Sequence, residues 1–261
     1  MRTNLLAYLL PLSLLAGCGG ADPNGDAASV SAALDSSDQT ANDSALMMAT
    51  TQGTESATSS TEAAGMANGA AKTFWQPSTC VTTSQTNNVV TYTLANCTGP
   101  YGLVHVTGSV VATYTADSAG IHAAVVTNGL QVNGATMSLD STADYTVNGT
   151  AKKLVVSTSG SGTGAFGNSI TRQGGYTLTW DDASQCGTLD GAWSTVIGTA
   201  TWSTSIDNYA QCKARCPTSG VLSHTGGLSK TTWTVTFDGT ASAKWASSRG
   251  RSGTIGLFCL P

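Results

Sequence analysis

An alternation of apolar and polar residues dominates residues 73–261 of this chain. It is complete over 232–237 (Thr-Trp-Thr-Val-Thr-Phe) and nearly complete over 104–114. A period of two places the two kinds of side chain on opposite faces of a β-strand. No stretch shows a sustained helical period, and these residues contain no glutamate but many threonines, valines and serines, which favour strands. The sequence therefore predicts an all-β domain.

Turn signals divide the alternating runs. Asn-Gly pairs occur at 128–129, 133–134 and 148–149, and Asp-Gly pairs at 190–191 and 238–239. Such pairs supply the positive φ angles that tight hairpins require. Their irregular spacing indicates recurring hairpins rather than a solenoid. We expect an antiparallel meander of roughly ten to thirteen strands, arranged as a sandwich or a large curled sheet.

The last hairpin allows a test of register. A two-residue turn at 238–239 would place Trp233 beside Lys244, whereas a three-residue loop pairs Trp233 with Trp245 and Val235 with Ala243. Because a slip of one residue turns every side chain to the other face, only the second register leaves one face apolar. We therefore expect a three-residue loop or an equivalent bulge.

Six of the seven cysteines lie in the alternating region. In an exported protein, an even number of cysteines indicates disulfides. Cys80 and Cys97 flank one hairpin, and Cys212 and Cys216 enclose a short loop. A bond between the remaining two would connect the end of the chain to the sheet. The alternative is a crossed pairing of the last four cysteines. The expected bridges are Cys80–Cys97, Cys212–Cys216 and Cys186–Cys259.

Residues 1–17 have the parts of an export signal. Arg2 is basic, residues 5–15 are nearly all apolar, and Ala16 and Gly17 are small. The apolar run is too short to span a bilayer, which takes about 20 helical residues. We expect this segment to be removed after export.

The residues Leu15-Ala16-Gly17-Cys18 resemble the lipobox of bacterial lipoproteins. The resemblance implies that the thiol of Cys18 receives a diacylglycerol, that the signal is cut before Cys18, and that the new amino group is acylated, for example with palmitate. Two or more acyl chains anchor a protein stably to a membrane. Gly19 stands where an aspartate would imply the inner membrane, so the resemblance implies the outer membrane, with the leaflet open.

Residues 18–72 predict a disordered acidic tether. They contain no aromatic residue, and seven acidic residues face one base, Lys72. Such a composition buries too little apolar surface to offset the entropy of ordering. Residues 45–49 are either a transient helical turn or a sticky patch of the linker. The expected division is a signal at 1–17, a lipidated tether at 18–72 and a β-domain at 73–261.

The domain itself resembles Thr/Gly-rich lipoproteins of environmental proteobacteria. The stretches that carry this resemblance are Asn96-Cys97-Thr98-Gly99, Cys216-Pro217 and Ser247 to Cys259. It implies no activity and transfers no functional residue.

No motif predicts catalysis or a resident metal. The Gly-x-Ser-x-Gly and His-Glu-x-x-His signatures are missing, and His105, His122 and His224 lie far apart in the sequence. Asp181 and Asp182 are interpreted as turn acids, with calcium as the alternative. Cys212 and Cys216 with His224 have an unusual spacing for zinc. We expect no catalytic residue, no metal and no cofactor.

The candidate ligand-binding residues lie near the C-terminus, which is basic. Arg249 and Arg251 could contact anionic polysaccharide, and an exposed Trp245 could stack on a sugar ring. An exported protein is not expected to bind nucleic acid. The prediction is a lipid-anchored envelope protein whose non-enzymatic domain binds a glycan or another envelope protein.

Three functional hypotheses make different structural predictions. A binding module predicts at least two exposed tryptophans near the two arginines. A structural coat protein predicts buried tryptophans and no pocket. An envelope hydrolase predicts a cleft that gathers a histidine with an aspartate.

Overall fold

The computed structural model describes residues 46–47, 49–51, 53–98, 105–165, 167–198, 200–212, 215–226 and 230–257. The predicted lipidation site Cys18 and the predicted disulfide partner Cys259 lie outside these residues.

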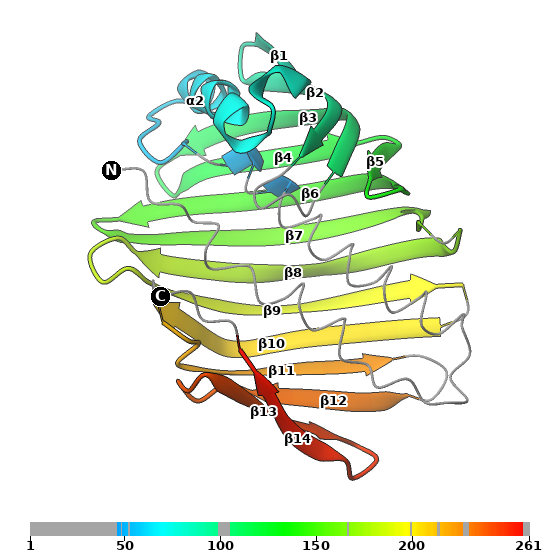
Figure 1. Cartoon of the computed structure of the whole chain (residues 1–261). Helices are drawn as coiled ribbons and strands as arrows, with labels where there is room; N and C mark the ends of the chain where they lie inside the picture. The colour runs from blue at the N-terminus through cyan, green and yellow to red at the C-terminus, as the bar shows by residue number, and fades with distance from the viewer. Residues whose placement is uncertain are drawn as a thin grey trace.

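One antiparallel sheet of 14 strands forms the domain (Figure 1). Neighbours in the sheet are neighbours in the sequence, except that β5 lies beside the main order and pairs with β3 and β6. The strands are β1 (Val81–Thr86), β2 (Val89–Thr98), β3 (His105–Asp117), β4 (Gly120–Thr127), β5 (Leu130–Val132), β6 (Ala135–Asn148), β7 (Ala151–Thr163), β8 (Ser169–Asp181), β9 (Cys186–Ile197), β10 (Ala200–Cys212), β11 (Ser219–Gly226), β12 (Thr231–Thr236), β13 (Ser242–Ser247) and β14 (Ser252–Gly256).

The predicted antiparallel meander is confirmed. Of the two expected arrangements, the structure has the large sheet rather than the sandwich, and its 14 strands exceed the expected ten to thirteen. One reason is that residues 192–206 read as one strand in the sequence, whereas the chain turns at Gly198, where φ is +59°, and divides into β9 and β10.

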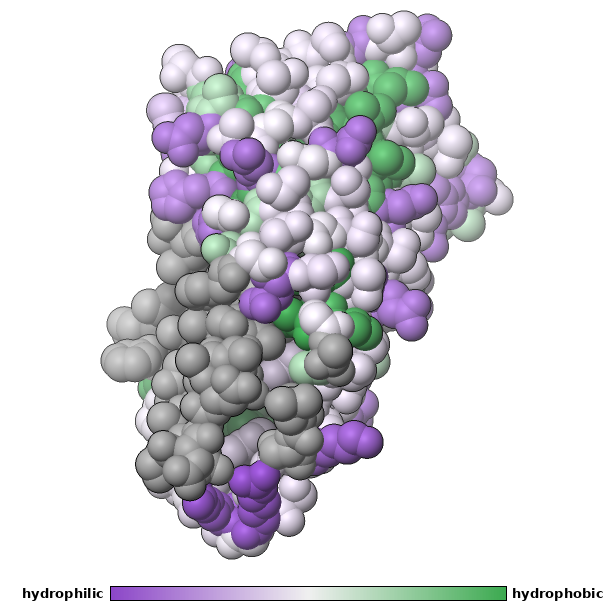
Figure 2. Space-filling view, turned by 90° about the vertical axis from the view of Figure 1, so that its right-hand side faces the viewer, coloured by the Kyte–Doolittle hydropathy of each residue, from purple (hydrophilic) through white to green (hydrophobic). Residues whose placement is uncertain are grey.

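The two faces of the sheet differ in composition. One face carries buried side chains in register, and we call it the apolar face. Examples on five strands are Val156, Tyr176, Ile206, Leu222 and Val235. The other face, called the polar face, carries the alternate residues, which are mostly serine and threonine. Figure 2 shows one side of the molecule, on which most of the described surface is white, with purple residues and groups of green residues among the white ones.

A helix covers one end of the apolar face. Helix α2 (Ser60–Phe74) packs against β1, β2 and β3 (Figure 1). Its buried side is made of small residues, which let the helix axis approach the sheet closely: Ala63, Ala64, Ala67, Ala71 and Phe74. The helix begins at a capping box, because the Ser59 hydroxyl accepts from the Glu62 N–H and the Glu62 carboxylate accepts from the Thr58 N–H.

This helix corrects the predicted tether. Residues 60–72 were expected to be disordered, and no helix was expected after them. The structure also makes residues 46–47 and 49–51 helical, with Leu46 and Met47 buried. Ordered structure therefore begins well before residue 73, because an alanine-rich helix gains its stability from the apolar face on which it packs.

Two buried tyrosines form hydrogen bonds in the interior under the helix. The hydroxyl of Tyr114 donates to the Thr50 carbonyl at 2.6 Å and lies 3.0 Å from the Tyr92 hydroxyl. Burial raises the pKa of Tyr92 to about 12 and also raises the pKa of Tyr114. The segment before α2 is thus part of the core.

Most Asn-Gly and Asp-Gly pairs form the expected turns. The glycines at 129, 134, 149 and 239 all have positive φ angles. Asp190 and Gly191 are the exception, because they lie within β9. The Asp-Gly pair did not predict a turn correctly there, because a glycine can also lie within a long strand of this sheet.

The last hairpin keeps the expected face but not the expected register. Val235 pairs with Trp245 and Trp233 with Ser247, so the loop is two residues longer than predicted. A shift by two residues conserves the orientation of every side chain. The apolar face is therefore retained.

The structure corrects two of the three disulfides. Cys80–Cys97 is present as predicted. Cys186 is bonded to Cys212, which rules out both Cys186–Cys259 and Cys212–Cys216. The physical reason is register, since Cys186 and Cys212 are direct cross-strand partners at one end of β9 and β10. Cys216 is also disulfide-bonded.

Candidate functional site

A groove crosses β8 to β11 and encloses about 660 Å³. Its outward side chains come from the polar face, namely Gln173, Ala192, Ser194, Ser203, Ser205, Ser223 and Thr225. Thr158, Gly174, Trp193 and Thr204 also border it, although the alternation turns their positions toward the apolar face. Among the described residues that line this polar groove, none is ionisable. The groove is suited to ligands that are recognised through neutral hydrogen bonds.

Glycines shape the floor of the groove. A Cβ atom at Gly175 would lie 2.3 Å from the Val156 carbonyl oxygen, and one at Gly174 would lie 2.4 Å from the Ala192 carbonyl oxygen. The neighbouring backbones thus approach β8 more closely than any side chain allows. Because Gly175 and Ala192 add little bulk to the polar face, the sheet is hollowed there.

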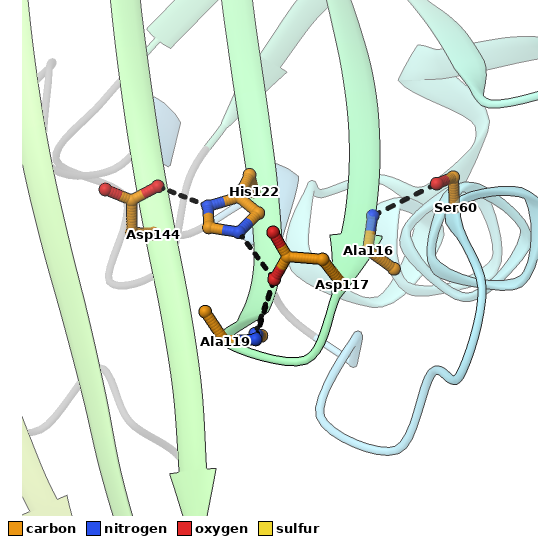
Figure 3. A network of polar contacts seen from close by, with 7 residues as sticks. Ser60, Ala116, Asp117, Ala119, His122 and Asp144 are labelled. Atoms are coloured by element: carbon orange, nitrogen blue, oxygen red, sulfur yellow. Dashed lines mark hydrogen bonds and ion pairs between the residues drawn. The ribbon is translucent and has the colours of Figure 1, made fainter.

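A second cluster lies on the polar face at β3, β4 and β6 (Figure 3). His122 lies between two carboxylates, with its Nδ1 2.6 Å from Asp144 Oδ1 and its Nε2 3.2 Å from Asp117 Oδ1. Asp117 also accepts from the backbone N–H groups of Ala119 and Gly120, in the turn between β3 and β4. The cluster therefore joins that turn to β6.

The electrostatics of this cluster favour a charged histidine. The hydrogen bonds to Asp144 and then to Asp117 raise the pKa of His122. The Ala119 N–H and then His122 lower the pKa of Asp117. Because both ring nitrogens donate to carboxylates, the protonated ring has no lone pair available for a substrate proton or a metal. This arrangement is suited to a structural ion pair.

The cluster also adjoins α2. The hydroxyl of Ser60 accepts from the N–H of Ala116, the residue before Asp117 (Figure 3). The first turn of the helix is thereby attached to the strand that carries the cluster. The site lies on an open surface, since the side chains of His122, Asp144 and Asp117 are 33%, 54% and 61% exposed.

The sequence did not indicate this cluster. The three histidines lie far apart in the sequence, and no residue near His122 in the sequence argues for its pairing with a carboxylate. The sequence contained part of the signal for this cluster, because Asp140 and Asp144 are spaced so that both side chains lie on the same face of their strand. Direct pairing of His122 with Asp144 becomes visible only when β4 is known to skip β5 and pair with β6.

The three predicted ligand-binding residues lie in one hairpin, formed by β13 and β14. Arg249 and Arg251 are exposed between β13 and β14, in a turn where the Arg249 N–H donates to the Ser247 hydroxyl. Trp245 belongs to the apolar face, where its ring is 5.5 Å from that of Trp233 and close to Gly253. None of the three borders the polar groove.

The tryptophans are mostly core residues. Trp75, Trp180, Trp193 and Trp202 are buried, and Trp233 and Trp245 are half-buried. The two exposed tryptophans that a stacking site would need near Arg249 and Arg251 are not found. Stacking on a sugar ring therefore has no support in the described structure.

The other candidate chemistry has structural explanations. His224 is bonded through Nδ1 to the Thr204 hydroxyl and stacks on Trp202. Cys212 is in a disulfide, so it provides no thiolate for zinc. Asp181 accepts from the Ala183 N–H, and Asp182 pairs with Lys152 at 2.8 Å. Within the described ranges, no group of three or more His, Cys, Asp or Glu side chains is arranged to hold a metal ion.

Membrane attachment rests on the sequence. No helix among the residues with described structure is both long and apolar enough to cross a bilayer.

Searches against protein families, curated proteins and solved structures gave no match for this chain.

Proposed function

We propose that this chain is a lipid-anchored protein of the bacterial envelope whose β-domain binds a partner without catalysing a reaction. The single observation that carries the binding role is the polar groove, an open hollow whose described lining residues offer hydroxyl and amide groups. Binding sites of this kind recognise ligands through a few well-placed polar groups.

The histidine cluster supports a non-enzymatic role. A hydrolase that uses a histidine as its general base needs a free ring nitrogen near a nucleophile. His122 uses both of its ring nitrogens in bonds to Asp117 and Asp144, and it lies on an open strand face. The geometry therefore favours a structural role for the group that is the best candidate for a base.

The anchor is tested by the intact mass of the mature protein extracted from native membranes. We expect the mass of residues 18–261 plus acyl chains, and a Cys18→Ser variant that is neither cleaved nor lipidated. A mature protein without acyl chains would contradict the anchored role. It would leave the binding role of the domain open to its own test.

The binding role is tested with the full-length mature protein in detergent on an array of bacterial surface glycans and envelope extracts. We expect Ser203→Ala and Ala192→Gln to weaken any binding, because the first removes a hydroxyl and the second fills the floor. Ser161→Ala is the matched control, since Ser161 is an exposed hydroxyl of the polar face on β7 outside the groove.

One observation favours a purely structural coat protein as the second candidate. That role predicts buried tryptophans, and four of the six are buried. It also predicts a surface without a pocket, which the groove does not match. If no glycan and no envelope protein binds the mature chain, the coat role replaces the binding role.

A further inference from the structure

The groove residues form a regular grid across four strands. One row runs through Gln173, Ser194, Ser203 and Thr225, which are successive cross-strand partners. The next row runs through Gly175, Ala192, Ser205 and Ser223. Neighbouring strands are about 4.8 Å apart, so the rows offer polar groups at short and regular intervals perpendicular to the strands.

The grid has unused hydrogen-bonding capacity. In the described part of the chain, the side chains of Gln173, Ser194, Ser203 and Ser223 make no hydrogen bond, while Thr225 is bonded to Thr232. Hydroxyls and amides both donate and accept. They match a ligand whose own groups also do both, which is the chemistry of a polyhydroxylated chain.

One rim of the groove is acidic. Asp190 is two residues before Ala192 on β9, and Asp207 is two residues after Ser205 on β10, so both carboxylates lie on the polar face beside the second row. The bulge in β10 positions Asp190, because the N–H of Asn208, the residue after Asp207, donates to Asp190 Oδ1 at 2.6 Å. Both side chains are exposed.

Among the described residues that line the groove, no basic side chain offsets this rim. Lys153 lies on β7 opposite Thr179, and Lys244 is paired with Asp238 at 3.1 Å. The buried Arg172 belongs to the apolar face, where it contacts Thr195. Two exposed carboxylates within about 10 Å of a ligand repel an anion at low salt.

We infer that the polar groove takes an uncharged, polyhydroxylated glycan chain and that Asp190 and Asp207 select against anionic glycans. This inference rests on the proposed function and specifies its ligand class. It moves the site away from Arg249 and Arg251, whose charge would favour the opposite class.

The test compares matched glycans. The full-length mature protein in detergent is applied to an array that carries neutral oligosaccharides beside their sulfated or carboxylated counterparts, at low and at high salt. We expect binding to neutral members only. In an Asp190→Asn, Asp207→Asn double variant, the affinity for the acidic counterparts relative to the neutral members should rise at least about threefold at low salt.

Two controls keep the test specific. Glu62→Gln removes the same charge from α2, which packs on the apolar face, and retains an acceptor for the helix cap. Asp207→Asn alone is the second control for the rim, since Asp190 also holds the bulge. The control at Glu62 should leave both kinds of binding unchanged.

The outcomes separate the two proposals. Equal or stronger binding of acidic members, or no effect of the rim variants, would overturn the selectivity while leaving the binding role intact. If neither neutral nor acidic glycans bind, the glycan inference fails. Binding of an envelope protein alone would then preserve the proposed function without it.

Discussion

His122 Nδ1 lies 2.6 Å from Asp144 Oδ1 across the pair of strands β4 and β6. With Asp117 on its other nitrogen, the ring crosslinks the turn between β3 and β4 to the next strand of the sheet. The raised pKa of His122 and the lowered pKa of Asp117 give this crosslink a defined pH range.

The first prediction is that the cluster stabilises the domain only at mildly acidic pH. A histidine whose pKa is raised on folding contributes fully below its unfolded pKa, about 6.5, and loses the contribution as pH rises through the folded pKa. An aspartate whose pKa is lowered contributes above its unfolded pKa, about 3.9, and loses the contribution as pH falls through the folded pKa. The largest effect is therefore expected between about pH 4 and pH 6.5.

The variant His122→Gln should lower the free energy of unfolding by about 0.5–1 kcal/mol at pH 5.5 and by almost nothing at pH 9, as measured by urea denaturation. His105→Gln is the control, because His105 is an exposed residue near the start of β3. A difference between wild type and His122→Gln that is independent of pH would show that packing, rather than charge, accounts for the effect.

The second prediction concerns two buried tyrosine hydroxyls. Tyr114→Phe leaves the Thr50 carbonyl and the Tyr92 hydroxyl with one partner fewer, and should cost about 1–3 kcal/mol. Tyr145→Phe removes a buried hydroxyl that has no hydrogen-bond partner in the described structure, and should be neutral or slightly stabilising. Thermal or chemical denaturation measures both variants.

Equal destabilisation by the two tyrosine variants would contradict this prediction. It would mean that the segment around Thr50 contributes no specific hydrogen bond to the core. A selective effect of Tyr114→Phe would instead establish in solution that the chain before α2 belongs to the folded domain.

The sequence allowed the class of fold to be predicted because the alternation is a local property. Residues 232–237 show which side chains share a face whatever their partners are. Local patterns do not fix register, so the final hairpin was displaced by two residues and the long run 192–206 was not divided.

Helix α2 was not predicted for a different reason. Its residues, STEAAGMANGAAKTF, have the composition of a linker and a buried side made almost entirely of alanine. In the sequence alone, such a stripe of alanines looks like a low-complexity linker, because the surface on which it packs is not known. The capping box from Ser59 to Glu62 was the available local signal.

The sites were less predictable than the fold, since each depends on pairing between strands. The polar groove needs four strands in register, and the histidine cluster needs β4 beside β6. The same dependence explains the disulfides, because Cys80 and Cys97 flank a hairpin whereas Cys186 and Cys212 meet only through the pairing of β9 and β10.

The third prediction tests that pairing. Peptide mapping of the non-reduced protein should yield a fragment that joins Cys186 to Cys212. The double variant Cys186→Ser, Cys212→Ser should lose about 2–4 kcal/mol of stability, because the bridge closes a loop with a sequence separation of 26 residues. A fragment joining Cys212 to Cys216 would restore the original expectation and contradict the register at the end of β10.

The fourth prediction contrasts two glycines. Gly175→Ala should destabilise the domain by about 1–3 kcal/mol, because its Cβ would lie 2.3 Å from the Val156 carbonyl oxygen and would push β7 away from β8. Gly69→Ala lies within α2, where an added Cβ has no neighbour within 4 Å. It should stabilise the domain by about 0.5–1 kcal/mol, because alanine is the better helix former.

Opposite signs for the same chemical change would separate close backbone approach in the sheet from simple loss of glycine flexibility. Denaturant unfolding of the two variants and of their double variant measures the signs and their additivity, which is expected because the sites share no partner. If Gly175→Ala were tolerated without loss, the backbones under the polar groove would be farther apart than described. The hollow that defines the groove would then need another cause.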